Sequence, residues 1–248
     1  ERDTSFSERS QGYGLTLQQA SKAMKSFGIN SLKAGIVSSK HIVHTTEGNI
    51  IGEWGMRKWM PSNTQKLQKQ INIHIARQSL RLALLEQLGE PNNVQWGHQL
   101  LDFKESDNKI DLSFQVNGEI KTIKTDLLVG ADGIRSSVRK ILLSEATLPL
   151  RYLDCMVILG ICKLSALENI ESPLLDSATV FQTANGKERI YIMPYDADSV
   201  MWQLRFPISE KEAKELSAKG AKYLKEEACK RANWHAPIPE ILTATLES

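Results

Sequence analysis

The chain has 248 residues, of which 41% are hydrophobic and 24% are charged, and this is typical of a globular protein with one large or two small domains. The 31 basic and 29 acidic residues nearly balance, which argues against a dedicated nucleic-acid-binding surface. No apolar stretch approaches the roughly 20 residues of a membrane span. The first residues lack the pattern of a signal peptide, and the three cysteines are widely spaced, so we expect a cytoplasmic protein.

The two ends of the chain suggest how it relates to its parent protein. It opens at Glu1-Arg2-Asp3 without a methionine and ends at Ser248, directly after a segment with regular patterning. We expect an internal piece of a longer protein. A processed product or a trimmed chain are the alternatives.

The first half of the chain mixes helical and strand patterns. Residues 17–27 have helical spacing that ends at Gly28, a residue favoured after a helix. Ile71, Ile73 and Ile75 alternate with polar residues, which predicts a half-buried strand. Further elements are predicted as a hairpin over 41–54, a helix through Leu80, Leu84 and Leu88, a strand near 99–104, and a hairpin of 111–116 and 119–125 around Asn117-Gly118.

The second half is richer in extended segments. Residues 127–130 are expected to form a short buried strand that leads into a helix. After Pro149 we predict strands over 156–163, 178–183, 188–193 and 199–206, followed by one largely solvated helix over 210–232. The first part is therefore α/β, and the part after about residue 149 is mostly antiparallel sheet.

The most distinctive stretch is LLVGADGIRSSVRK, residues 127–140. A strand that feeds a helix through a turn presents free backbone N–H groups and a positive helix end. Ala131 and Gly133 leave room for a ligand, Asp132 offers an acceptor for a ribose hydroxyl or a water, and Arg135 could pair with Asp132 or face a phosphate. The alternative is that Asp132 only caps the helix, and this stretch alone supports both interpretations equally.

Two other residues are candidates for ligand binding. Arg77 is expected where a strand becomes a helix, and an arginine there can hold an anionic or carbonyl-rich ligand. A surface arginine at a helix start is the commoner case. Glu1 would suit the acid that holds a ribose hydroxyl at the end of a strand, although a terminal glutamate alone indicates almost nothing.

Taken together and in this order, these residues resemble the single-component FAD-dependent monooxygenases of the p-hydroxybenzoate-hydroxylase type. The Glu1-Arg2-Asp3 segment is similar to the end of that family's second strand, and GYGLTL at 12–17 is similar to the loop that follows it. The HIARQSL run at 74–80 resembles the helix start whose arginine contacts FAD. The stretch around Asp132 and Gly133 closely matches the family's Asp-Gly motif, which is implicated in binding both FAD and NAD(P)H.

The resemblance implies a fold and an activity. It implies an incomplete FAD/NAD(P)-binding Rossmann-like domain over 1–35 and 70–148, and an antiparallel substrate-binding sheet domain over 36–69 and 149–248. It implies a hydroxylase that uses NADPH or NADH and O₂ on an aromatic or other electron-rich small molecule. The cofactor would be held by six residues, with no metal and no protein nucleophile: Glu1, Arg2, Arg77, Asp132, Gly133 and Arg135.

Two motifs of that family do not occur in the chain. The Gly-x-Gly-x-x-Gly phosphate loop should precede Glu1, and a Gly-Asp dipeptide should follow the substrate-domain strands. Their absence motivates an alternative from another class, an inactive fragment or degenerate relative that serves as a non-catalytic module. A flavin-dependent reductase or epoxidase on the same fold is the third possibility.

Overall fold

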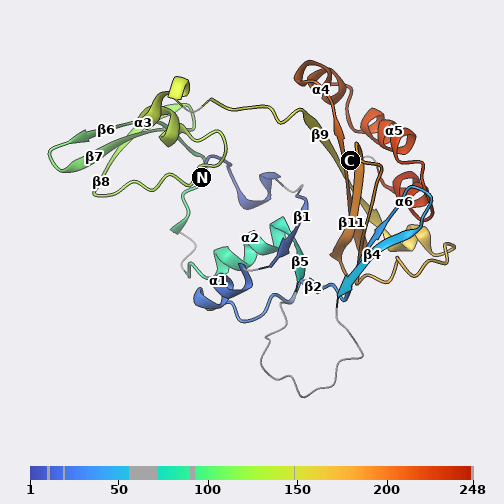
Figure 1. The fold of residues 1–248 in the computed structure, drawn as a ribbon. Coiled ribbons are helices and arrows are strands. Elements are labelled where there is room, and N and C mark those ends of the chain that lie inside the picture. Colours follow the sequence, from blue (N-terminus) through green and yellow to red (C-terminus); the bar gives the residue numbers. More distant parts are fainter. Residues whose placement is uncertain (10–11, 19, 56–71, 90–92, 148, 247–248) are drawn as a thin grey trace. The chain divides into compact units, whose positions relative to one another are not determined.

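The computed structural model describes the chain except residues 10–11, 19, 56–71, 90–92, 148 and 247–248. The backbone divides into two compact units (Figure 1). Unit 1 comprises Glu1–Gln11 and Leu88–Arg151, and unit 2 comprises Gly12–Gln87 and Tyr152–Ser248. Compactness does not report which residues bind a flavin or a substrate, so the predicted division into binding domains stays a prediction.

Unit 1 is a three-stranded antiparallel sheet with one helix on it. The strands β6 (His98–Ser106), β7 (Lys109–Val116) and β8 (Glu119–Thr125) lie in that order, and α3 (Ser137–Thr147) packs on β6. A short 3₁₀ helix, η1, spans Phe6–Arg9. Asn117 and Gly118 both have positive φ, at 51° and 87°, which confirms the predicted hairpin with the backbone twist of a type I′ turn.

The smaller sheet of unit 2 has the antiparallel order β1 (Gly14–Leu17), β5 (Ile73–Ala76), β2 (Ile36–Val37). The helix α1 (Ala20–Ser26) begins later than predicted, because Leu17 pairs with Ile73 in the sheet. Gly28 has φ +82°, and the N–H groups of Gly28 and Ile29 donate to the carbonyls of Lys25 and Met24. These are the two bonds of a Schellman motif, so the predicted helix end is confirmed. Of the predicted strand, Ile71 lies outside the described residues.

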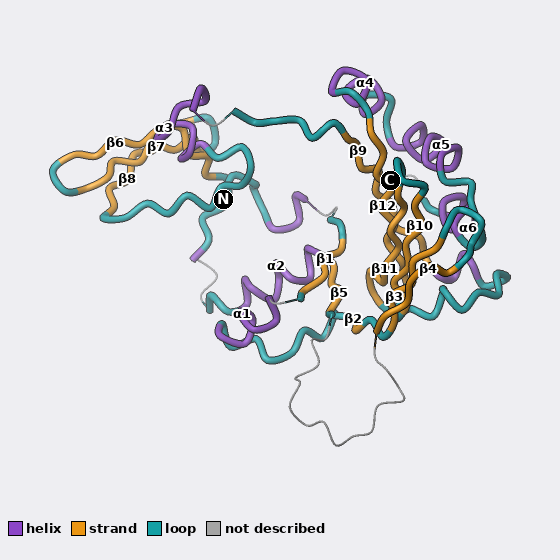
Figure 2. The backbone as a smooth tube through the Cα atoms, in the orientation of Figure 1, coloured by secondary structure: helices purple, strands orange, loops and turns teal. Residues whose placement is uncertain are grey.

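The larger sheet of unit 2 has the order β4-β3-β10-β11-β12-β9 (Figure 2). Every neighbouring pair is antiparallel except β3 and β10, which run parallel. The predicted strands are therefore present, although the sheet is mixed rather than purely antiparallel. The strands are β3 (Lys40–His44), β4 (Ile50–Gly55), β9 (Cys155–Lys163), β10 (Thr179–Ala184), β11 (Arg189–Asp196) and β12 (Ser199–Pro207).

Helices cover one face of this large sheet (Figure 2). The predicted helix over 210–232 is two helices, α4 (Glu210–Ser217) and α5 (Ala221–Arg231), because Gly220 adopts φ +84° and breaks the run. A third helix, α6 (Ile238–Ala244), was not predicted, although Ile238, Ile241 and Leu242 are fully buried. Prolines at 237 and 239 are unfavourable inside a helix, so the sequence pattern does not indicate that a helix begins here. Among the helices that the structure describes, none has both the length and the apolar character to cross a membrane.

Trp202 is the largest side chain of the core under these helices. It is 1% exposed, and its indole N–H donates to the hydroxyl of Thr245, with 2.8 Å between nitrogen and oxygen. Gly160, its partner on β9, leaves no space for a side chain because a Cβ there would overlap the indole ring. The ring therefore lies directly over the backbone of the neighbouring strand.

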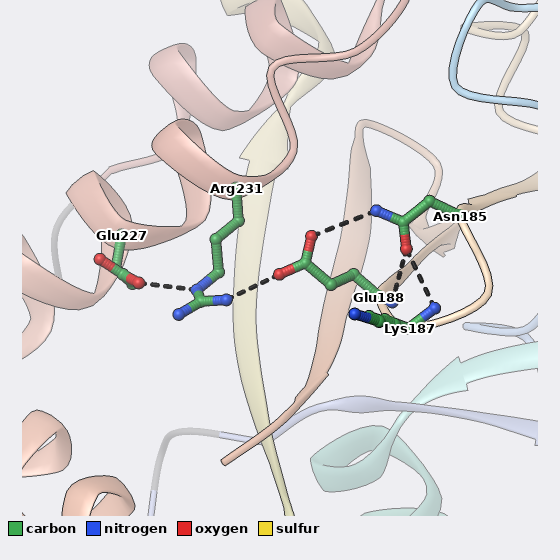
Figure 3. Close-up of polar contacts among 5 residues, drawn as sticks. All are labelled: Asn185, Lys187, Glu188, Glu227 and Arg231. Atoms are coloured by element: carbon green, nitrogen blue, oxygen red, sulfur yellow. Dashed lines mark hydrogen bonds and ion pairs between the residues drawn. The ribbon is translucent and has the colours of Figure 1, made fainter.

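A partly buried ion pair joins α5 to the turn between β10 and β11 (Figure 3). The Arg231 guanidinium donates to Glu227 at 2.6 Å on its own helix and to Glu188 at 2.7 Å. The Asn185 side chain accepts the N–H groups of Lys187 and Glu188, which closes the turn. This network holds the start of β11 against the helical layer.

We expect Gly160→Ala to destabilise the protein by about 1–3 kcal/mol, because the added methyl group must displace the Trp202 ring from a close-packed core. Denaturant unfolding followed by tryptophan fluorescence measures this change. Gly52→Ala is the matched control, since a Cβ on that β4 glycine meets only ordinary contacts at 3.8 Å. Equal effects of the two substitutions would contradict the packing argument.

Candidate functional site

The segment before Asp132 differs from its prediction. Residues 127–130 were expected to form a buried strand, but they pair with none of the described strands. Leu127 is 72% exposed and Val129 is 74% exposed. A strand needs a neighbour for its backbone hydrogen bonds, and β8 has already ended at Thr125. The expectation of a buried strand is therefore wrong for this chain.

The turn itself is shaped by two glycines. A Cβ at Gly130 would lie 2.9 Å from the Val138 side chain, so only glycine lets the chain pass this close to α3. Gly133 has φ +79°, a left-handed conformation that favours glycine, and its carbonyl accepts the N–H of Ser136. The turn thus brings residue 132 back over the first turn of α3.

Asp132 caps α3. Its Oδ2 accepts the N–H of Ser137 at 2.6 Å and that of Val138 at 3.2 Å, while the Ser136 hydroxyl accepts the N–H of Arg139. Slight desolvation raises the pKa of Asp132, but the hydrogen bonds from Ser136, Val138 and Ser137 outweigh it and lower that pKa overall. The capping interpretation therefore describes the hydrogen bonds that Asp132 makes.

The basic residues near this turn are not bound to Asp132. Arg135 is exposed and makes no hydrogen bond or ion pair with the described residues, and Arg139 donates to the carbonyl of Ile134. The prediction that Arg135 could pair with Asp132 is not realised, since that carboxylate accepts backbone and hydroxyl groups instead. Arg135 remains available to an anionic ligand.

The first residues of the chain run beside the start of β6. The N–H of His98 donates to the Glu1 carbonyl at 2.8 Å, and that of Gly97 donates to the Asp3 carbonyl at 2.8 Å. Glu1 and Arg2 are both exposed. No hydrogen bond or ion pair of the described residues joins Glu1 or Arg2 to Asp132 or Arg135, so these four predicted ligands share unit 1 without direct contact.

Arg77 lies in unit 2, at the junction that the sequence predicts. Strand β5 ends at Ala76, and α2 (Arg77–Glu86) begins at Arg77, whose N–H donates to the Tyr13 carbonyl at 3.1 Å. Ala76 has no side chain that could cap the helix. The half-buried Arg77 therefore lies at a positive helix end whose first turn carries no acid, which suits an anionic or carbonyl-rich ligand.

A glycine segment packs against Arg77 and was not among the predicted ligands. A Cβ at Gly12 would lie 3.4 Å from the Cβ of Arg77, and the Gly12 carbonyl accepts the hydroxyl of Tyr195 at 3.2 Å. Gly14 lies directly on the large sheet, since a Cβ there would come within 2.7 Å of the Met193 Cε. The Gly-Tyr-Gly sequence at 12–14 could have indicated this segment as part of a binding site. Its contact with β11 could not be predicted, because that contact depends on tertiary packing.

The large sheet has a second face, opposite the helices, which we call the open face. On β11, β12 and β9 it presents four cross-strand rows, set by the register of the strands. Met193 and Met201, the methionines nearest Gly14, are buried beneath β1. On β9, the side chains of Val157, Leu159 and Ile161 are 45%, 46% and 37% exposed. The rows are Arg189–Arg205–Val157, Tyr191–Gln203–Leu159, Met193–Met201–Ile161 and, past the bulge in β11, Asp196–Ser199–Lys163.

Burial governs the titration of the groups beside this face. It raises the pKa of Tyr191, against the opposing effects of Arg189 and a hydrogen bond from Thr16. At neutral pH Tyr191 is therefore an uncharged phenol. In β5, burial and the nearby His41 lower the pKa of His74 to about 4, and its Nε2 has no hydrogen-bond partner among the described residues.

A helix start that carries a cation and no acid, beside a glycine turn, is a feature that sites for nucleotide cofactors use. The chain belongs to the FAD binding domain family, which it matches over residues 23–247. The resemblance to flavin monooxygenases and the predicted fold class are thereby confirmed. No curated protein sequence matches the chain.

Solved structures with this fold include flavin enzymes. HpxO of Klebsiella pneumoniae, in complex with FAD and uric acid, is 16% identical with a TM-score of 0.74 over 96% of this chain and 56% of its own. The 2,6-dihydroxypyridine-3-hydroxylase of Arthrobacter nicotinovorans is 12% identical, with a TM-score of 0.73 over 94% and 60%. The tetracycline destructase Tet(51) is 15% identical, with a TM-score of 0.56 over 100% and 60%. The chain thus spans about three fifths of these proteins.

We expect Asp132→Ala to lower the stability of the protein by about 1 kcal/mol at neutral pH, because α3 loses its capping carboxylate. A lowered pKa means that this stabilisation is present above the aspartate's unfolded pKa and is lost as the pH falls through its folded pKa. Chemical denaturation at neutral and acidic pH should therefore show a difference that shrinks in acid. Asp126→Ala, which removes an exposed acid with a surface ion pair, is the control and should change little.

We expect His74 to make the protein less stable in weak acid. Its folded pKa of about 4 lies below the ordinary 6.5, so stability is full above pH 6.5 and falls as the pH is lowered toward 4, where the unfolded chain binds the proton first. The slope of the unfolding free energy against pH reports how many protons the chain takes up on unfolding. In His74→Gln this uptake should be smaller over this pH range, by up to one proton per molecule. An unchanged slope would mean that His74 is protonated in the fold.

Proposed function

We propose that the protein is an FAD-dependent monooxygenase, which uses NADPH or NADH and O₂ to hydroxylate an aromatic or other electron-rich small molecule. Membership of the FAD binding domain family supports the cofactor. One fold neighbour is by its name a hydroxylase of 2,6-dihydroxypyridine, and another is in complex with both FAD and uric acid.

The observation that carries the proposal is the position of Arg77. Arg77 is the first residue of α2, whose start has no side-chain cap, and its Cβ packs against Gly12, while the same glycine segment lies on the open face of the large sheet. A cofactor held by Arg77 would therefore extend along a surface that already offers apolar and hydrogen-bonding side chains to a substrate. Cofactor and substrate can meet there without any protein nucleophile.

When bound, FAD supplies the redox chemistry, taking a hydride from the nicotinamide and passing electrons to O₂. The chain's own residues bind and orient. Arg77 donates hydrogen bonds to carbonyl or phosphate oxygens, and the missing side chains at Gly12 and Gly14 let the glycine segment pack closely on Arg77 and on Met193, which keeps Arg77 beside the large sheet. The apolar β9 side chains Val157, Leu159 and Ile161 keep water from the reacting atoms. Exclusion of water favours oxygen transfer to the substrate over hydrolytic side reactions.

In unit 1 we propose that Glu1, Arg2, Asp132, Gly133 and Arg135 contact the cofactor. Since the Asp132 carboxylate already occupies the start of α3, it would repel a phosphate there and suits a ribose or ribityl hydroxyl better. Arg2 and Arg135, both exposed, are the cations available for phosphate. Glu1 would accept a hydrogen bond from a ribose hydroxyl.

We expect Arg77→Gln to weaken FAD binding by about 10-fold or more, because a charge-assisted contact at a half-buried position is lost. Titration of the purified protein with FAD, followed by flavin fluorescence quenching, measures this affinity. Lys22→Gln, which removes an exposed charge from α1, is the matched control and should bind as the parent does. A purified protein with no flavin absorbance and no affinity for added FAD would contradict the proposed function.

A further inference from the structure

Two histidines from distant parts of the chain lie together on the side of the large sheet that the helices cover. His44 is the last residue of β3, and His235 lies in the segment between α5 and α6. Their ring centroids are 4.7 Å apart, and the ring planes are tilted by 47°. The His44 ring also meets the edge of Phe181, which belongs to the core under the helices. The pair is therefore separate from the open face and from Arg77.

His44 is buried with an unused nitrogen. The residue is 4% exposed, and its Nδ1 has no hydrogen-bond partner among the described residues. Burial, and next the nearby His235, lower the pKa of His44 against the opposing effect of a hydrogen bond to the Gln182 backbone. The ring is therefore neutral at neutral pH, with one N–H and one lone pair. Because the Gln182 backbone takes the N–H, Nδ1 keeps the lone pair.

His235 is held so that its own lone pair faces the same place. Its Nδ1 lies 2.7 Å from the Ala236 carbonyl, and its Nε2 lies 2.8 Å from the Thr183 hydroxyl. A carbonyl can only accept, so Nδ1 carries the proton and Nε2 accepts from the hydroxyl. Thr183 is the direct partner of His44 in the parallel pairing of β3 with β10. The Nε2 lone pair is therefore directed to the strand position beside His44.

These features are typical of histidines that bind a metal ion. Such a histidine usually donates its second ring N–H to a carbonyl or carboxylate, as His235 does to Ala236. Zinc binds imidazole nitrogens at about 2.0–2.1 Å, which places the centroids of two rings on one ion about 4.5–5.5 Å apart. The 4.7 Å between the two rings lies within this range.

The donor atoms select the kind of ion. Imidazole nitrogens suit zinc, copper and nickel, whereas magnesium and calcium prefer oxygen ligands. His235 is partly exposed, so an ion can enter from solvent together with its waters. In the part of the chain that the structure describes, no third His, Cys, Asp or Glu joins the pair as a ligand. Water would complete the coordination, which makes the site exchangeable.

We propose that His44 and His235 together bind a divalent transition-metal ion such as Zn²⁺, through His44 Nδ1 and His235 Nε2. The ion would join the β3–β4 hairpin to the segment before α6. Gly48 of the hairpin turn already packs on this segment, since a Cβ there would lie 3.1 Å from the His235 Cβ. This inference does not depend on the proposed monooxygenase function.

The test uses zinc chloride as the probe, after dialysis of the protein against a chelator and then against metal-free buffer. Calorimetric titration, with and without FAD, gives the affinity and the number of ions bound. We expect one ion per chain, with an affinity that falls about 10-fold or more in His44→Gln and in His235→Gln. His235→Cys, which replaces one zinc ligand by another, should retain binding.

Two controls separate this site from adventitious binding. His98→Gln removes another histidine with an unpartnered nitrogen, whose ring neighbour is Phe114 rather than a second histidine. Cys229→Ser removes a partly exposed thiol of α5. Both variants should bind zinc as the parent does.

Thermal unfolding provides a second readout. An ion that binds only the folded protein raises the midpoint of unfolding, so zinc should raise it in the parent and much less in His44→Gln and His235→Gln. Circular dichroism without metal checks that these variants keep the parent's fold. No zinc binding by the parent, or binding that neither glutamine variant weakens, would overturn the inference. Flavin absorbance of the same samples reports on the proposed function separately, because a yellow protein that binds no zinc would contradict only the metal site.

Discussion

The contact between Gly14 and the methionines of the large sheet determines how unit 2 is built. Because Gly14 has no side chain, β1 lies directly on Met193 and Met201, and its N–H donates to the Met201 sulfur at 2.9 Å. This contact places the small sheet, and with it Arg77 at the start of α2, beside the open face. A larger residue at position 14 would separate the two sheets and the proposed cofactor and substrate surfaces with them.

Whether a charged side chain has a hydrogen-bond or ion-pair partner within the fold determines whether it is available to a ligand. Asp132 and Arg231 have their partners within the fold, and they act as a helix cap and a tie between layers. Arg77, Arg189 and Arg205 make no ion pair with any residue that the structure describes. The unpaired arginines are therefore the groups that a ligand can use, and the paired ones hold the geometry in which they are presented.

Much of the local structure could be predicted because it depends on neighbours in sequence. Asn117-Gly118 and Gly28 adopt the positive φ values on which their turn and helix end depend, and Arg77 begins a helix as expected. The failures have tertiary causes. Residues 127–130 are apolar but have no strand beside them, and α6 is a helix because Ile238, Ile241 and Leu242 fill a space under the sheet.

By itself the sequence indicated the family and the order of most elements, since motifs and periodicity are properties of the chain, and it suggested six cofactor residues that stay a prediction. It could not show that Asp132 accepts two backbone N–H groups of α3, nor that Arg189 faces Arg205 across two strands. Residues 16 positions apart become partners only through strand register, and register follows from which face of each strand the core buries. The tertiary structure alone decided which charges are satisfied and which remain for a ligand.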